Sequence, residues 1–151
     1  MKPIDDKKTI EQNTKLEEGL VAEREEWNKK ITDLIYMMKD NKKLSEAQVF
    51  QLSYRQQVQE RLAVYRTLLE KKQENMDKQI TARFREYTLN YDIKLSSSEK
   101  MAFVNTDVAA LKLQVKMISV QISYFEECVK TLDNFGFAVR NKIEIVSQQL
   151  I

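Results

Sequence analysis

Apolar residues recur along most of the chain at an alternating spacing of three and four residues, and the repeat is strongest between residues 101 and 150. Fourteen of the fifteen positions in that repeat are apolar, although only 42% of the chain is hydrophobic. A repeat of 3.5 residues predicts an α-helix whose continuous seam packs against a partner helix, as in a coiled coil. The fifteen positions are Met101, Val104, Val108, Leu111, Val115, Ile118, Ile122, Phe125, Val129, Leu132, Gly136, Val139, Ile143, Val146 and Leu150.

A first helical segment is expected from about Lys8 to Lys39, with Gly19 weakening its early turns. Its apolar positions are Leu16, Leu20, Trp27, Ile31, Leu34 and Met38. The polar stretch 39–43 that follows reads as a connection to the next helix.

A second helix is expected to begin at Ser45 and to run without a breaker to about Asn90. Ser45 and Gln48 have the spacing of a capping box. Its apolar stripe is Phe50, Tyr54, Val58, Leu62, Tyr65, Leu69, Met76, Ile80, Phe84, Tyr87 and Tyr91. The polar residues 71–73 interrupt the stripe, which predicts a bend or a solvated stretch there.

A polar loop is expected between Asn90 and Ser98, because three consecutive serines end this stretch. Serine is a favoured N-cap residue. Ser97 or Ser98 is therefore expected to cap the last helix.

The last helix carries a second apolar stripe on another face, formed by Ala110, Leu113, Met117, Val120 and Tyr124. A helix that is apolar on two faces must be covered on two sides. We therefore expect an all-α protein of long amphipathic helices that form a coiled-coil-like bundle within a homo-oligomer. A monomeric antiparallel three-helix bundle is the alternative, because it needs the same heptads. The expected oligomer interface is Val108, Leu111, Val115, Ile118, Ile122, Phe125, Val129 and Leu132.

This organisation predicts an N-terminal helical segment over residues 1–40 and a long helical hairpin over 41–151 that carries the oligomerisation core, 101–150. The chain of 151 residues contains only two glycines and one proline, which favours few and long helices. Gly136 occupies a seam position, and because the heptads continue in phase across it, we expect a continuous or kinked helix there.

The residue types present argue against catalysis. Histidine is absent, and Cys128 is the only cysteine, so a zinc site, an intramolecular disulfide and a thiol nucleophile with a histidine base are not expected. Cys128 lies within a helical run and is expected to be a small buried hydrophobe. No phosphate-binding loop or nucleophile elbow is present. We expect no enzyme activity, no metal, no cofactor and no small-molecule substrate.

No segment has the roughly 20 consecutive apolar residues that a membrane span needs, and the first residues lack the apolar core of a signal peptide. The protein is therefore expected to have no membrane partner and to stay in the cytoplasm, which is the host cytoplasm if a phage encodes it. Its net charge of +2 does not by itself indicate nucleic acid.

Basic and aromatic residues interleave at one place, in residues 78–87 and shortly beyond. Proteins that bind single strands combine cations that contact phosphates with aromatic rings on which bases stack. The candidate nucleic-acid contacts are Lys78, Arg83, Arg85 and Lys94. The alternative interpretation is that the aromatic residues of this stretch are core and that Arg83 and Arg85 are merely solvated.

The order of several short motifs resembles a known family. Residues 82–84 (Ala-Arg-Phe) with Tyr87, then 98–101 (Ser-Glu-Lys-Met), then Asp107 with Leu111, then Cys128 and 136–140 (Gly-Phe-Ala-Val-Arg) are similar to the recombination mediators of tailed phages, the UvsY-like family. The resemblance covers residues 78–145 well and the first 75 loosely, and the order and spacing of the motifs carry it.

This resemblance implies a helical homo-oligomer that binds single-stranded DNA, helps to displace the single-strand-binding protein and loads a RecA-like recombinase. The family's Lys-Ala-Arg element for DNA contact falls on residues 81–83, where Arg83 is retained and Thr81 replaces the lysine. The alternative function is a coiled-coil scaffold or adaptor, such as a virion or assembly component, that does not bind nucleic acid.

Overall fold

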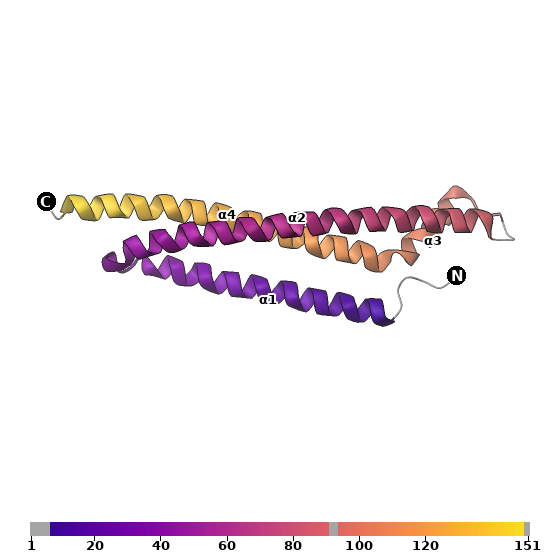
Figure 1. The fold of residues 1–151 in the computed structure, drawn as a ribbon, viewed down its shortest axis with the longest axis horizontal. Coiled ribbons are helices and arrows are strands. Elements are labelled where there is room, and N and C mark those ends of the chain that lie inside the picture. The colour runs from indigo at the N-terminus through magenta and orange to yellow at the C-terminus, as the bar shows by residue number, and fades with distance from the viewer. Residues whose placement is uncertain (1–6, 91–93, 150–151) are drawn as a thin grey trace. The chain divides into compact units, whose positions relative to one another are not determined.

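The computed structural model describes residues 7–90 and 94–149, and the elements within them are helical (Figure 1). Helix α1 spans Lys7–Met37, the short 3₁₀ helix η1 spans Asn41–Lys43, α2 spans Leu44–Leu89, α3 spans Ser97–Asp107 and α4 spans Ala109–Gln149. None of the described residues lies in a β-strand, so the predicted all-α fold is confirmed. Tyr91 and Leu150, assigned above to the apolar stripes, lie outside the described residues.

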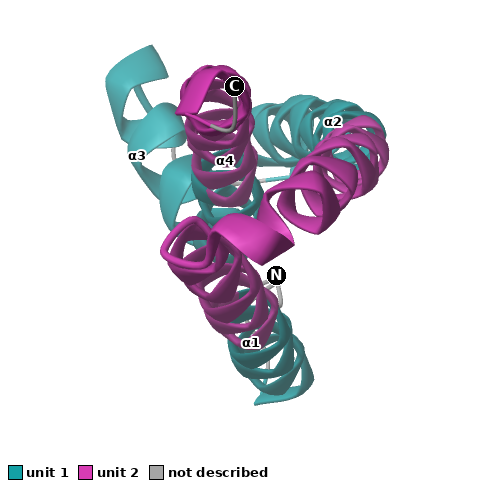
Figure 2. Ribbon diagram, turned by 90° about the vertical axis from the view of Figure 1, so that its left-hand side faces the viewer, with its two compact units in different colours: residues 1–20, 66–120 teal, residues 21–65, 121–151 magenta. Residues whose placement is uncertain are grey.

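The chain forms two compact units (Figure 2). Unit 1 contains Met1–Leu20 and Arg66–Val120, and unit 2 contains Val21–Tyr65 and Gln121–Ile151. Helices α1, α2 and α4 each contribute residues to both units. The expected organisation into an N-terminal segment over residues 1–40 and a hairpin over 41–151 stays a prediction.

Aromatic rings from three helices meet in the core of unit 2. Phe125 of α4 is fully buried, stacks on Tyr65 of α2 with ring centroids 5.8 Å apart, and meets the edge of Trp27 of α1 at 6.4 Å. Trp27 in turn contacts Tyr54 of α2 edge-to-face at 5.7 Å. Each such pair contributes about 0.5–1.5 kcal/mol beyond the burial of its area. One heptad residue of α4 thus joins α1 and α2.

Side-chain contacts in unit 2 fix the helix directions. Gln51 of α2 donates from its Nε2 to the carbonyl oxygen of Leu132 at 3.0 Å, whereas Tyr65, further along α2, stacks on Phe125, so α2 and α4 run antiparallel. The contact between Arg24 and Gln121, and the bond from Lys142 to the carbonyl of Met38, show that α1 and α4 run parallel.

A charged cluster lies between α1 and α2 in unit 2. Arg61 donates to both carboxylate oxygens of Glu23, at 2.6 Å and 3.1 Å, and the Tyr65 hydroxyl also donates to Glu23. The Glu23 carboxylate raises the pKa of Arg61 by its hydrogen bond. Burial and the neighbouring Glu23 raise the pKa of Tyr65.

Buried amides join α1 and α4 in unit 1. Asn13 donates from its Nδ2 to the carbonyl oxygen of Ala110 at 3.1 Å, and Gln114 donates from its Nε2 to Oδ1 of Asn13 at 2.7 Å. Both side chains are 6% exposed. A buried polar group is costly without a partner, so these bonds select one alignment of α1 against α4 in unit 1.

The starts of two helices differ from the sequence predictions. Ser45 is not the N-cap of α2, because η1 leads directly into this helix and Asp40 caps η1 by accepting from the backbone N–H of Lys42 at 3.0 Å. Neither Ser97 nor Ser98 caps α3. Ser96 does, in a capping box with Glu99, since only this serine has a glutamate three residues later.

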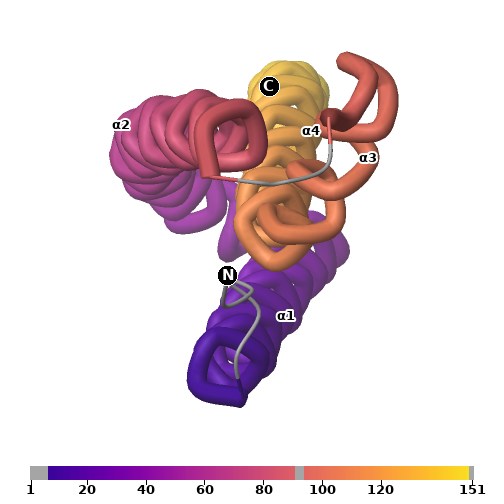
Figure 3. The backbone as a smooth tube through the Cα atoms, turned by 90° about the vertical axis from the view of Figure 1, so that its right-hand side faces the viewer, coloured from indigo at the N-terminus to yellow at the C-terminus, as the bar shows by residue number. Residues whose placement is uncertain are grey.

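The predicted continuous heptad helix over residues 101–150 is interrupted at Val108. This residue has φ −103° and ψ 12°, and α3 lies at an angle to α4 instead of extending its axis (Figure 3). Val104 and Val108 are both fully buried, so the apolar repeat continues through the break. Helix α4 itself runs through Gly136 without interruption, as expected.

The heptad seam lies mainly in the interior of one chain. Among the eight residues predicted to form an oligomer interface, Val108, Ile118, Ile122, Phe125 and Leu132 are buried. Leu111, Val115 and Val129 are half-buried. This is the packing expected of the alternative, a bundle within one chain. That copies associate through these residues stays a prediction.

The two glycines give a matched stability test. A Cβ at Gly19 would meet nothing within 4 Å, whereas a Cβ at Gly136 would lie 2.9 Å from Nε2 of Gln51. Gly19→Ala should stabilise the fold by about 0.5–1 kcal/mol, because glycine is unfavourable within a helix. Gly136→Ala should destabilise it by about 1–2 kcal/mol, because the displaced Gln51 amide loses its bond to Leu132. Urea denaturation measures both changes.

The control removes the side chain that the new methyl group would displace. In a Gln51→Ala background, Gly136→Ala should become stabilising by the same amount as Gly19→Ala. If Gly136→Ala stabilises the wild-type chain as much as Gly19→Ala does, the close approach of Gln51 is not what selects glycine.

Alkaline pH should destabilise unit 2. Burial raises the pKa values of Cys128, Tyr65 and Tyr124 above their ordinary values of 9.0 for the thiol and 10.0 for the phenols. The folded state therefore keeps protons that the unfolded state loses, so stability is full below about pH 9 and falls as pH rises. Each group contributes about 1.4 kcal/mol per pH unit within its own window.

Urea denaturation between pH 8 and 11 measures this loss. Cys128→Ala should delay its onset to about pH 10, where the tyrosines of the unfolded chain ionise. A free energy of unfolding that stays constant up to pH 11 would contradict the assignment of this loss to the raised pKa values of Cys128, Tyr65 and Tyr124.

Candidate functional site

The four predicted nucleic-acid contacts lie in unit 1, on the last turns of α2 and in the segment before α3. Lys78, Arg85 and Lys94 are exposed, and Arg83 is half-buried. Successive residues of a helix point about 100° apart, so Lys78 and Arg85 share one face and Arg83 points about 160° away from Arg85. The structure therefore does not bring the four cations together on one surface.

The face that carries Lys78 and Arg85 is balanced in charge. A shallow depression along this face is lined by Glu74, Asp77, Lys78, Thr81, Ala82 and Arg85. Lys78 pairs with Glu74 at 3.1 Å, and both side chains are largely exposed. Exposed pairs of this kind contribute little to stability. Two carboxylates beside two cations make this face a poor phosphate site.

The opposite side of α2 meets α3 through an aromatic pair. Tyr87 is buried and stacks on Phe103 of α3, with ring centroids 5.6 Å apart and an angle of 24° between the planes. The Tyr87 hydroxyl donates to Oδ2 of Asp107 at 2.6 Å, which holds the tyrosine ring against α3. Phe103 nevertheless remains 49% exposed. The Phe103 ring therefore packs on Tyr87 and is still open to solvent.

Cations lie near this aromatic pair. Lys100 is one turn before Phe103 on α3, and its Nζ lies 5.5 Å from the ring centroid of Phe84. Arg83 is one turn before Tyr87 on α2, and among residues 7–90 and 94–149 no carboxylate pairs with it. Lys94 lies two residues before the N-cap of α3. Of the carboxylates on α3, Asp107 accepts from Tyr87, and Glu99 accepts from the backbone of Ser96 at 3.3 Å, while Glu86 lies one turn after Arg83 on α2.

Phe103 and Lys100 were not among the predicted contacts. The sequence did contain a signal for Phe103, because it lies between the seam positions Met101 and Val104 and so cannot share their face. An aromatic residue off the seam of an amphipathic helix is exposed unless another element covers it. Its support by Tyr87 depends on the angle between α3 and α4, which the heptads did not predict.

Other chemistry is sparse. No three His, Cys, Asp or Glu side chains in the described ranges gather in a way that could hold a metal ion. Cys128 is 5% exposed, and burial raises the pKa of its thiol, as expected of a packed hydrophobe. Within residues 7–90 and 94–149, the helices are too polar for any of them to cross a membrane.

Comparison with protein-family models, with curated proteins and with solved structures found no match to this chain.

Proposed function

We propose that the protein is an oligomeric single-stranded-DNA-binding recombination mediator, which helps to load a RecA-like recombinase in place of a single-strand-binding protein. In this proposal the strand contacts α3 and the adjoining side of α2 in unit 1. The resemblance of residues 78–145 to phage recombination mediators supports the type of function. The exposed Phe103 ring on Tyr87 is the observation that carries the site.

Base stacking suits the chemistry of this surface. A base that stacks on an aromatic side chain gains about 1–3 kcal/mol for any sequence. Phe103 offers such a ring, and its position on the buried Tyr87 limits its freedom before binding. Lys100, Arg83 and Lys94 supply the cations for neighbouring phosphates. Arginine adds a fork of donors that suits phosphate oxygens.

The chain's net charge of +2 is small for a DNA-binding protein, so several copies acting on one strand are part of the proposal. Linked sites gain avidity without any new contact in each copy. Apolar surface for such association exists on unit 1, where Ile10 and Leu113 line one shallow depression and are 56% and 46% exposed. Val120, two turns after Leu113, is 49% exposed. Leu113 and Val120 belong to the second apolar stripe.

A scaffold or adaptor that does not bind nucleic acid is the second candidate. Three exposed apolar side chains on unit 2 favour the scaffold. These are Val49, Leu52 and Phe137, and each is about 60% exposed or more. Surfaces of this kind mark contacts with other proteins. The two candidates differ in whether the protein binds a single strand at all.

Fluorescence polarisation with labelled oligo-dT tests the DNA site. Arg83→Ala and Lys100→Ala should each weaken binding and reduce the dependence of log affinity on log salt concentration by about 0.7, because each removes one phosphate contact. Phe103→Leu should cost about 1–3 kcal/mol of binding with the salt dependence unchanged, since it removes a ring and no charge.

Arg85→Ala is the matched control, because this arginine lies on the opposite face of the same helix turns. It should leave affinity and salt dependence close to wild type. An Arg83→Ala variant with wild-type affinity and slope would remove Arg83 from the site. No binding by micromolar protein at low salt would favour the scaffold.

Sedimentation velocity at two protein concentrations tests the oligomer. The wild-type protein should have a mass above that of one chain, and Leu113→Asp should lower it, because a carboxylate would enter an apolar contact. Val64→Asp, at a site that is 52% exposed on α2 in unit 2, should leave the mass unchanged. A single-chain mass at every concentration would rule out the oligomer and the avidity that depends on it.

A further inference from the structure

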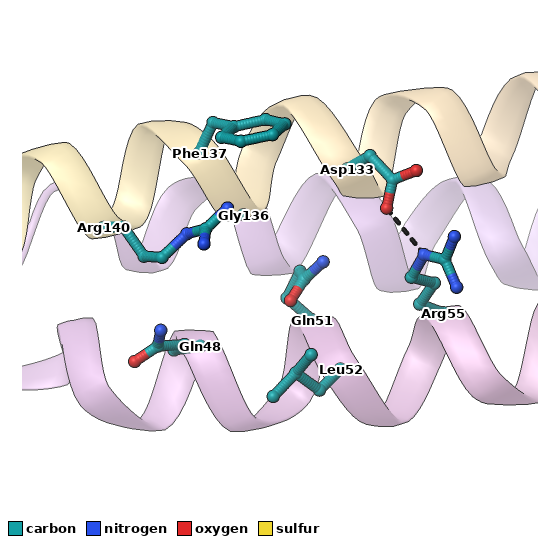
Figure 4. A pocket seen from close by; sticks show the side chains of 8 residues that line it. All are labelled: Gln48, Gln51, Leu52, Arg55, Asp133, Gly136, Phe137 and Arg140. Atoms are coloured by element: carbon teal, nitrogen blue, oxygen red, sulfur yellow. Dashed lines mark hydrogen bonds and ion pairs between the residues drawn. The ribbon is translucent and has the colours of Figure 1, made fainter.

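A groove runs between α2 and α4 in unit 2 (Figure 4). It has a volume of about 640 Å³. Four of the residues that line the groove belong to α2 and the other four belong to α4. The groove is lined by Gln48, Gln51, Leu52, Arg55, Asp133, Gly136, Phe137 and Arg140.

Contacts within the chain hold the floor of this groove in place. Gln51 points from α2 to α4 over Gly136, where a Cβ would lie 2.9 Å from its Nε2, and donates to the carbonyl of Leu132 at 3.0 Å. Arg55 donates from its Nε to Oδ1 of Asp133 at 2.6 Å (Figure 4). The groove is thus formed before any ligand arrives, so little ordering is needed on binding.

The sides of the groove expose apolar surface that the other described residues leave uncovered. Leu52 is 61% exposed and Phe137 is 59% exposed, on opposite sides of the groove. Val49, one turn before Leu52 on the same face of α2, is 67% exposed. Apolar residues at this spacing, beside a groove between two helices, suit an amphipathic helix laid along it.

The charged groups of the groove favour an acidic occupant. The guanidinium of Arg140 lies 4.7 Å from the ring centroid of Phe137. Among the described residues no carboxylate pairs with it. Arg55 donates from its Nε to Asp133. The N–H groups on its two outer nitrogens are left to bind a second carboxylate. Asp133, the one carboxylate among the described residues that line the groove, is therefore neutralised, and an excess of positive charge remains.

We infer that this groove is a docking site for an acidic amphipathic helix of another protein. The apolar residues of that helix contact Leu52 and Phe137, and its carboxylates pair with Arg140 and with the outer nitrogens of Arg55. A nucleic-acid strand suits the groove less well, because only one lining cation is free of a carboxylate and phosphates recur along a strand at regular spacing. This inference does not rest on the proposed DNA binding.

Selection from a peptide library tests the chemistry of the occupant. The library displays 16-residue helical peptides with leucines at the i, i+3, i+4 and i+7 positions and random residues elsewhere, and the full-length chain is the bait. Selected peptides should be enriched in aspartate and glutamate. Their binding should fall at least tenfold with Arg140→Glu and with Phe137→Ser, and several-fold with Arg140→Gln.

Lys130→Glu is the matched control, because it makes the same change of charge on an exposed residue of α4 that does not line the groove. It should bind the selected peptides as the wild-type protein does. Circular dichroism should show all these variants to be as helical as wild type, since Arg140, Phe137 and Lys130 are exposed.

Three results would overturn the inference. The first is a selection that yields no peptides, that yields peptides without acidic enrichment, or that yields peptides which bind the Arg140→Glu variant as tightly as the wild-type protein. The second is a lower sedimenting mass for Phe137→Ser, which would assign the groove to a second copy of this chain. The third is displacement of the selected peptides by oligo-dT, which would assign it to nucleic acid.

Discussion

The packing of α4 against the other helices of its own chain is the constraint on which the rest of the structure depends. The apolar heptad positions of α4 favour burial, which gains about 25 cal/mol per Å² of apolar surface. In unit 2, Phe125 meets this need by contacting one ring from α1 and one from α2. The other features follow from the fact that these partners come from the same chain. Most of the seam is buried within one chain, and the exposed rings of the two candidate surfaces, Phe103 and Phe137, lie off the seam.

Hydrophobic contact alone would leave the alignment of these helices poorly defined, because a heptad seam repeats and fits its partner equally well one heptad further along. Buried polar groups break this degeneracy, as a single buried asparagine does in coiled coils. In unit 1, Asn13 and Gln114 bond to each other and to a backbone carbonyl. In unit 2, Gln51 reaches Leu132 across Gly136. A shift by one heptad would leave each of these amides buried without its partner, at about 1–3 kcal/mol each.

The sequence predicted the helices well because periodicity depends only on which residues avoid water. It predicted their starts less well, because capping is a local choice: Ser96 is distinguished from Ser97 and Ser98 only by Glu99, three residues later. The break at Val108 could not be predicted from the heptads, since the seam keeps its phase through it. Nor could the spacing decide whether the seam faces its own chain or a copy. The candidate site shows the same limit. The spacing of 100° per residue could have separated Arg83 from Arg85 on the predicted helix, but the stacking of Phe103 on Tyr87 depends on a contact between α2 and α3 that periodicity does not give.

The surface chemistry of a chain with nearly balanced charge limits how it can bind other molecules. Phosphate contacts weaken as salt rises, by a factor that grows with each contact, whereas stacking and apolar burial depend little on salt. A protein with a net charge of only +2 therefore needs rings and apolar side chains next to its cations if it is to bind at physiological salt. Both candidate surfaces have this combination: Lys100 lies one turn from Phe103 in unit 1, and Arg140 lies over Phe137 in unit 2. In each, the cation selects the sign of the partner's charge and the exposed ring supplies affinity that salt does not screen.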